Sequence, residues 1–199
     1  MSEVVARPLR ADAERTVRTI MEAAERTLGR NPAATMEDIA AAAGVARTTV
    51  HRRFATREAL ITAMATWATR QLADAVDAAR PESSPPLVAL YQATANVLQV
   101  KISWGFSMNS AFAMGSESER IHAEVVERCD QLFRRTQEAG ILREDVDPVW
   151  ARRVYYALIH EVCQDVSTAD ANDADTDALA TQLIDTLLRG VGNPTSQLY

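Results

Sequence analysis

The sequence predicts an all-α protein, and three observations support this fold class. Apolar residues recur at the three- and four-residue spacing of a helix instead of alternating as in a strand, β-branched runs are short, and alanine is abundant. The 199 residues, 47% of them hydrophobic, suffice for one compact domain or for a small domain fused to a larger one. Seven glycines and seven prolines are too few for a linker-rich or disordered chain.

The first predicted helix spans residues 12–29. Its apolar positions follow the spacing i, i+3, i+4, i+7 and i+11, and Asp12 is placed to cap its first turn. These positions are Val17, Ile20, Met21, Ala24 and Leu28. Gly29 and the pair Asn31-Pro32 are predicted to end the helix.

Two short helices are predicted next. Thr35 and Asp38 form a capping-box-like pattern at the start of a helix over residues 36–43. Gly44 suits the left-handed position of a tight turn after that helix. A further short helix is predicted over residues 46–53.

The remaining two thirds of the chain continue the helical pattern. Thr56 is the expected cap of a longer helix that ends near Ala79. The segment 80–86 is the clearest loop, Gly140 interrupts the pattern, and Asp147-Pro148 is a strong helix start. The expected helical segments cover about 87–114, 119–139, 148–167 and 177–190, with an acidic loop at 170–177.

Charge is distributed unevenly along the chain. The net charge of −6 alone argues against nucleic-acid binding. Residues 1–60, however, hold ten arginines and eight acidic residues, whereas residues 61–199 hold eleven basic and nineteen acidic residues. A mildly basic head on an acidic body indicates that only the head meets an anion.

Several features predict a cytoplasmic protein without a membrane segment. No apolar run approaches the ~20 residues that a membrane-spanning helix needs, and the N-terminal residues lack the apolar stretch of a secretory signal. The two cysteines, Cys129 and Cys163, do not make a disulfide framework in a chain of this length.

The helix predicted over residues 46–53 carries the most informative pattern. Val50 and Phe54 are placed to pack against the preceding helix. The outer face is then polar and mostly basic, with Arg47, Thr48, Thr49, His51, Arg52 and Arg53. A short helix with such donors on its exposed face is what reading of the DNA major groove requires.

The ordered pattern across this segment resembles the helix-turn-helix of TetR-family repressors. The matching residues are Thr35, Glu37, Asp38, Ile39, Ala40, Gly44, Val45, Thr49, His51, Phe54 and Arg57. The resemblance covers residues 12–60 well, and the rest of the chain matches in helix count and layout. This chain departs from the family in having His51 where Tyr is usual and Arg57 where Lys is usual.

The resemblance implies a DNA-binding domain over residues 1–58 and a helical ligand-sensing and dimerisation domain over residues 59–199. Within the first domain we expect Arg47, Thr48 and Arg52 to contact base edges, with Arg53 on the same surface. We expect phosphate contacts from Thr35, Thr49, His51 and Arg57. Arg7 and Arg10 fit either an arm in the minor groove or a frayed terminus.

The second domain is expected to form a homodimer through its two C-terminal helices and to bind a small-molecule effector. Large soft side chains and interspersed polar groups suggest an apolar pocket, although each aromatic alone fits ordinary core packing equally well. The candidate ligand-binding residues are Trp67, Gln71, Tyr91, Trp104, Met108, Phe112, Phe133, Tyr156 and His160. The acidic excess fits a cationic ligand or simple surface solvation.

No catalytic, metal or cofactor site is expected. The segment after Trp104 lacks the second glycine of a nucleophile elbow, and no phosphate-binding glycine loop occurs. The spacing of His160 and Cys163 lacks the paired ligands of zinc sites. The sequence thus predicts a ligand-responsive regulator, a repressor by its resemblance, that binds a palindromic double-stranded operator as a dimer. The alternatives are an architectural DNA-binding protein, or a small-molecule-binding or enzymatic bundle with a degenerate helix-turn-helix.

Overall fold

The computed structural model describes residues 6–111, 116–165 and 174–192. Every regular element within these ranges is a helix, so the all-α prediction is confirmed. The nine helices of the described ranges are α1 (Ala6–Arg30), α2 (Met36–Ala43), α3 (Arg47–Arg53), α4 (Arg57–Ala78), α5 (Pro86–Ser103), α6 (Gly105–Ala111), α7 (Ser116–Glu138), α8 (Pro148–Asp165) and α9 (Thr176–Val191).

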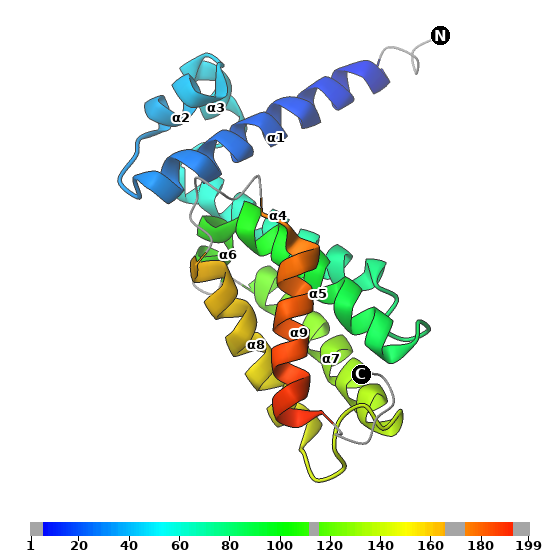
Figure 1. Ribbon diagram of the computed structural model, residues 1–199. Helices are drawn as coiled ribbons and strands as arrows, with labels where there is room; N and C mark the ends of the chain where they lie inside the picture. Colours follow the sequence, from blue (N-terminus) through cyan, green and yellow to red (C-terminus); the bar gives the residue numbers. More distant parts are fainter. Residues whose placement is uncertain (1–5, 112–115, 166–173, 193–199) are drawn as a thin grey trace.

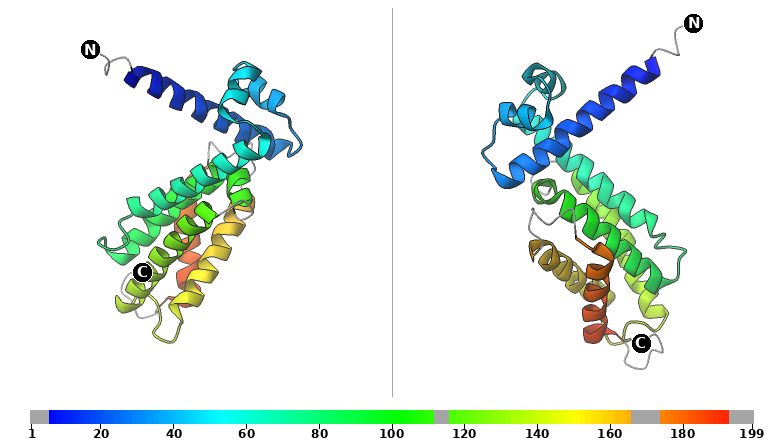
Figure 2. Two further views of the ribbon diagram at one scale, coloured as in Figure 1. Left: turned by 180° about the vertical axis from the view of Figure 1, so that it is seen from behind. Right: turned by 45° about the horizontal axis from the view of Figure 1, so that its top comes forward.

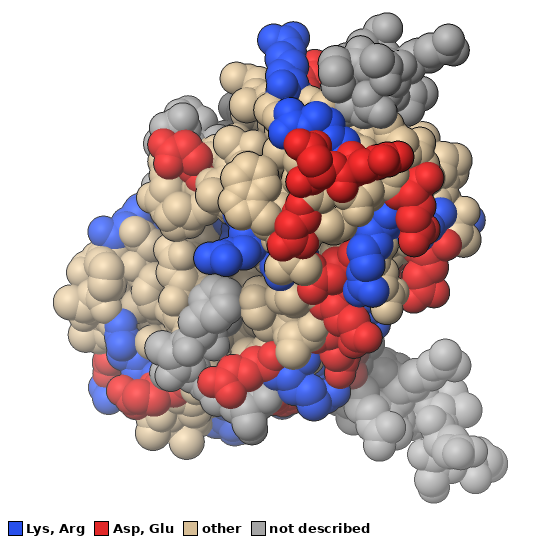
Figure 3. Space-filling view, turned by 90° about the horizontal axis from the view of Figure 1, so that it is seen from below, with Lys and Arg blue, Asp and Glu red and all other residues tan. Residues whose placement is uncertain are grey.

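The helices form a small head and a larger body. Figures 1 and 2 show α1, α2 and α3 together at one end, with α4 leading from this head into the body. The body consists of α4, α5, α7, α8 and α9, and α6 lies where the head meets it (Figure 1). Seen from the end opposite α2 and α3, acidic side chains gather in a band along one side (Figure 3).

The capping box and the glycine turn predicted at the two ends of α2 are confirmed. The Asp38 amide donates to the Thr35 hydroxyl at 3.2 Å, and the Thr35 amide donates to the Asp38 carboxylate at 2.9 Å, which completes the capping box. Gly44 ends the helix with φ of 67°, a conformation that costs glycine little. The predicted bounds of α2 are confirmed.

The first helix starts earlier than the sequence suggests. It begins at Ala6, and Asp12 lies inside it, where its backbone carbonyl accepts a hydrogen bond from the Thr16 hydroxyl at 2.8 Å. The prediction that Asp12 caps the helix is therefore wrong. Pro8 falls in the first turn, where a missing amide hydrogen breaks no helical hydrogen bond.

The expected continuous helix over residues 87–114 is broken. The chain leaves helical geometry at Trp104, which has φ of −128° and ψ of 39°, and α6 starts at Gly105. The break depends on a contact from α1, described below, that local periodicity does not contain. The next helix, α7, begins at Ser116, three residues before the predicted start.

The interruption predicted at Gly140 and the helix start predicted at Asp147 are confirmed. Gly140 adopts φ of 71° after α7, and the Asp147 carboxylate accepts a hydrogen bond from the Val149 amide at 3.0 Å at the start of α8. Asp175 caps α9 by accepting from the Ala178 amide at 3.0 Å.

Buried aliphatic and aromatic side chains hold the body together. Leu90, Leu98, Phe133, Ile184 and Leu187 are at most 2% exposed, and each such burial stabilises the fold by roughly 1.5–3 kcal/mol. Polar contacts fix the register of the helices: the Tyr91 hydroxyl donates to the Asp185 carboxylate at 2.8 Å, joining α5 to α9. No helix in the described ranges combines the length and apolar character that crossing a bilayer requires.

Candidate nucleic-acid interface and ligand cavity

The short helix α3 presents one buried and one exposed face. Val50 is fully buried and Phe54 is 7% exposed, so they fix α3 against the head. Around the rest of the helix, Arg47, Thr48, His51, Arg52 and Arg53 are exposed, and Thr49 is half-buried. The predicted burial of Val50 and Phe54 is confirmed, whereas Arg53 lies beside α1, where it lines a groove with Arg18 and Trp67.

The turn between α2 and α3 holds the two helices close together. Ile39 is fully buried and Ala40 is 3% exposed, and the small Ala40 side chain permits a close approach of the helices. The Val45 amide donates to the Ala40 carbonyl at 3.1 Å directly after Gly44. This geometry is that of a helix-turn-helix whose second helix points outward.

Arg47 is engaged with neighbouring side chains. Its Nε lies 2.7 Å from the Glu37 carboxylate on α2 and donates weakly to His51 Nε2 at 3.5 Å. Both members of the Arg47–Glu37 pair are largely exposed, so the contact is worth only about 0–1 kcal/mol. A stronger anion can therefore displace Glu37.

Thr35 and Arg57 are occupied by contacts within the head. The hydroxyl of Thr35 belongs to the capping box of α2. The guanidinium of Arg57 donates to the Ala34 carbonyl at 3.2 Å and to the Pro32 carbonyl, so it clamps the loop between α1 and α2. Both residues shape the loop beside the start of α2. These contacts could not be predicted from the sequence, because the acceptors are backbone carbonyls.

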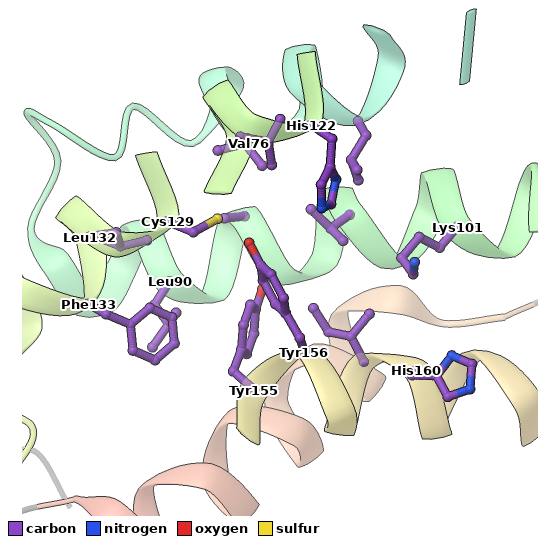
Figure 4. A pocket seen from close by; sticks show the side chains of 15 residues that line it. Val76, Leu90, Lys101, His122, Cys129, Leu132, Phe133, Tyr155, Tyr156 and His160 are labelled. Carbon is purple, nitrogen blue, oxygen red and sulfur yellow. The ribbon is translucent and has the colours of Figure 1, made fainter. Parts of the chain in front are cut away.

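A cavity of about 240 Å³ lies in the body between α4, α5, α7 and α8 (Figure 4). Its walls are mostly aliphatic and aromatic. The fifteen lining residues are Leu72, Val76, Leu90, Ala93, Val97, Lys101, His122, Val125, Cys129, Leu132, Phe133, Tyr155, Tyr156, Ile159 and His160. An apolar cavity with a few polar groups is how small-molecule sites are built.

Only part of the predicted ligand set lines this cavity. Phe133, Tyr156 and His160 do, and Phe112 lies outside the described residues. The other candidates, which do not line it, are Trp67, Gln71, Tyr91, Trp104 and Met108.

Contacts elsewhere in the structure hold Trp104 and Tyr91. Trp104 is buried at the break, and its ring centroid lies 4.3 Å from that of Trp67 on α4, near the junction with the head. Tyr91 is held by Asp185 on α9. The other twelve lining residues, mostly aliphatic, were not predicted, because helix packing and not side-chain size decides which residues face the cavity.

Burial governs the titration of the groups in the cavity wall. Desolvation raises the pKa of the Cys129 thiol and of the Tyr155 and Tyr156 phenols, so all three are protonated at neutral pH. Desolvation, assisted by the positive charges of Lys101 and Arg152, lowers the pKa of His122. The Tyr156 hydroxyl points toward Cys129 (Figure 4) and makes no well-formed hydrogen bond to the described residues.

A buried carboxylate joins the head to the body. Glu25 on α1 is 8% exposed and accepts hydrogen bonds from the backbone amides of Phe106 at 2.7 Å and Ser107 at 3.1 Å. These amides belong to the free donors of the first turn of α6. Burial raises the pKa of Glu25, whereas the hydrogen bonds from Ser107 and Phe106 act in the opposite direction.

Comparison with known proteins finds a family model and a relative that resemble this chain. The family model described as "Bacterial regulatory proteins, tetR family" matches residues 20–64, which include the whole helix-turn-helix. The HTH-type transcriptional repressor LfrR of Mycolicibacterium smegmatis is 29% identical over 170 residues, which cover 85% of this chain and 89% of LfrR.

Solved structures share this fold over most of the chain. PfmR of Thermus thermophilus, a TetR-family regulator, superposes with a TM-score of 0.72 at 20% identity, covering 85% of this chain and 97% of PfmR. LfrR in complex with proflavine superposes with a TM-score of 0.64 at 27% identity, covering 89% and 97%. NalD of Pseudomonas aeruginosa, the secondary repressor of the MexAB-OprM multidrug efflux pump, gives 0.57 at 26% identity, covering 92% and 99%. The chain is thus similar to TetR-family regulators: the family model matches its helix-turn-helix, and the relatives match most of its length.

Proposed function

We propose that this protein is a ligand-responsive transcriptional repressor that binds a palindromic operator as a homodimer. The observation that carries the proposal is the outer face of α3, where basic and hydroxyl side chains are exposed while Val50 and Phe54 fix the helix from behind. This arrangement is suited to insertion into the major groove. LfrR and NalD, which share the fold, are described as repressors.

The residues of α3 divide by chemistry. We propose that Arg47, Thr48 and Arg52 read base edges, since guanidinium groups pair with guanine and Thr contacts thymine methyl groups. Thr49, His51 and Arg53 then bind phosphates beside the groove. When the protein binds DNA, the ion pair between Arg47 and Glu37 breaks and Arg47 contacts the DNA instead.

Thr35 and Arg57 have a different part in the proposal. Arg57 already donates to the carbonyls of Pro32 and Ala34, and Thr35 already caps α2. We propose that both act mainly as positioning residues, which hold the loop and the N-terminus of α2 where backbone amides meet the phosphate backbone.

The proposed dimer interface is the outer face of α8 and α9. Leu158 and Val162 on α8 and Leu179 on α9 are only partly buried, and they line a surface groove together with Gln182 and Thr186. Trp150, near the start of α8, is 51% exposed. Apolar exposure on two adjacent helices suits a symmetric four-helix contact between two copies.

The cavity in the body is the proposed effector site. LfrR has been solved with proflavine bound, and we infer that this chain likewise binds a small molecule. A ligand that prefers one arrangement of the dimer shifts operator affinity by its differential affinity, typically about 1–3 kcal/mol. Glu25, which joins α1 to α6, and α4, which joins head to body, are the routes for this coupling.

Selection of bound duplexes from a random library tests the DNA-binding claim. The proposal predicts recovery of a palindrome whose half-sites are separated by about one helical turn or a multiple of it. The matched control is the R47A/R52A variant, which should recover no common sequence. Recovery of unrelated sequences by the parent protein would instead indicate an architectural role, and absence of salt-dependent binding would refute DNA recognition altogether.

A further inference from the structure

The cavity wall contains basic residues but no acidic ones. Three of its fifteen lining residues are basic by type, namely Lys101, His122 and His160, and none is Asp or Glu. The body as a whole is acidic, so the lining has a sign opposite to that of its surroundings. The acidic excess of the sequence, which suits a cationic ligand, is therefore not found at the cavity wall.

The basic residues converge at one end of the cavity from three helices. Lys101 comes from α5, His122 from α7 and His160 from α8, and Figure 4 shows them on the same side of Tyr156. The other end is formed by Leu90, Leu132 and Phe133, each at most 2% exposed (Figure 4). The cavity thus has a basic end, which holds the ammonium group of Lys101, and an apolar end.

Lys101 places an ammonium group at this end of the cavity. It is the sole lysine of the chain, it is half-buried, and it has no ion pair with a carboxylate in the described part of the chain. The neighbouring Arg152, in contrast, is paired with Asp130 at 2.5 Å. A partly desolvated ammonium group gains most from an anion that brings its own charge into the site.

We propose that the cavity binds an amphipathic organic anion, with the carboxylate at Lys101 and the hydrocarbon tail among Leu90, Leu132 and Phe133. The cavity of about 240 Å³ lies at the small end of the ~300–1,000 Å³ typical of ligand pockets. A chain of medium length fits this space better than a large polycyclic drug. This inference rests on the proposed role of the cavity as effector site and specifies the chemical class of its ligand.

A set of matched probes isolates the contribution of charge. Decanoate, 1-decanol and decylamine share the hydrocarbon tail and differ in the charge of the head group. Calorimetric titration of the full-length protein, below the micellar concentration of each probe, should give binding in the order decanoate, decanol, decylamine. Weaker binding of decanoate than of decylamine, or no binding of decanoate, would overturn the proposal.

Variants of Lys101 locate the charge. K101M should weaken decanoate binding by about tenfold or more while leaving decanol within about twofold, since only the ion pair is removed. K101R keeps the positive charge and should retain most of the affinity. K101Q serves where the thermal unfolding of K101M shows a folding defect. Unchanged decanoate affinity in both uncharged variants would contradict the assignment.

A second measurement distinguishes a failure of the proposed ligand class from a failure of the proposed regulation. Operator release is measured independently, by adding decanoate to the protein–DNA complex. Charge-dependent binding without any change in operator affinity would leave the ligand class standing and refute the proposed regulation. Operator release by a probe that binds K101M and the parent equally would leave the regulation standing and refute the ligand class.

Discussion

The carboxylate of Glu25, in the head, accepts hydrogen bonds from both the backbone amide and the hydroxyl of Ser107, in the body. Glu25 thereby caps α6 from a helix that precedes it by some eighty residues. A buried carboxylate is retained at this position because the amides of Phe106 and Ser107 replace its water. The contact ties the orientation of α1 to the position of α6.

Removing this carboxylate should destabilise the protein. E25A leaves two amides and one hydroxyl without their acceptor, and we expect a loss of about 1–3 kcal/mol of unfolding free energy. Urea denaturation followed by circular dichroism measures the change. E22A, an exposed glutamate on the same helix, is the control and should shift stability by less than about 0.5 kcal/mol. Equal effects of the two variants would mean that the Glu25 contact contributes nothing.

Glu25 also predicts the direction of a pH dependence. Burial raises its pKa in the folded state, so the folded protein takes up a proton at a higher pH than the unfolded chain does. The stability of the parent relative to E25Q should therefore rise as pH falls from neutral toward about 4.5, the ordinary value for a glutamate. Other titrating groups largely cancel in this difference. A difference that stays constant, or that falls with pH, is incompatible with the raised pKa.

The pairing of Arg47 with Glu37 predicts a gain in DNA affinity on removal of the acid. E37Q frees Arg47 and removes a negative charge beside the proposed groove surface, so operator affinity should increase by about two- to tenfold at moderate salt. E58Q, which removes an exposed acid at the start of α4, is the comparison variant. Gel-shift titrations check both. A weaker complex with E37Q would indicate that Glu37 itself helps to position the operator.

We expect Arg57 to act by positioning the loop and not by contacting phosphate, and two variants distinguish these roles. If it acts through the loop carbonyls of Pro32 and Ala34, R57M should lower the stability of the protein and its operator affinity together. R57K, which keeps the charge but loses the paired donor geometry, should show a similar loss of stability. If Arg57 instead contacts phosphate, R57M should leave stability unchanged and reduce the salt dependence of binding by about one unit of slope.

Local signals made the head predictable. The capping residues Thr35 and Asp38, the turn at Gly44 and the apolar pair Val50 and Phe54 lie within twenty residues of one another, and each determines its own geometry. Periodicity and capping chemistry therefore predicted α2 and α3 almost residue by residue. The start of α1 was misplaced because Asp12 is chemically suited to a cap that the chain does not use.

The body was less predictable because distant contacts decide it. The break at Trp104 depends on Glu25, which no local pattern connects to α6. The cavity depends on how four helices pack, so small residues such as Ala93 line it while Trp104 does not. Lys101 stands out in the sequence as the sole lysine, but its place in the cavity wall depends on the neighbouring helices.

We propose that side chains on the outer face of α3 recognise the operator sequence. The most direct measurement is fluorescence anisotropy of the selected operator and of a scrambled duplex, at one salt concentration, with the parent, R52A and R134A. The account predicts that the parent prefers the operator by about 10³-fold or more, and that R52A loses about five- to 150-fold of that preference. R134A, exposed on α7, should match the parent. An R52A variant that keeps the full preference, with R47A doing the same, would contradict the account.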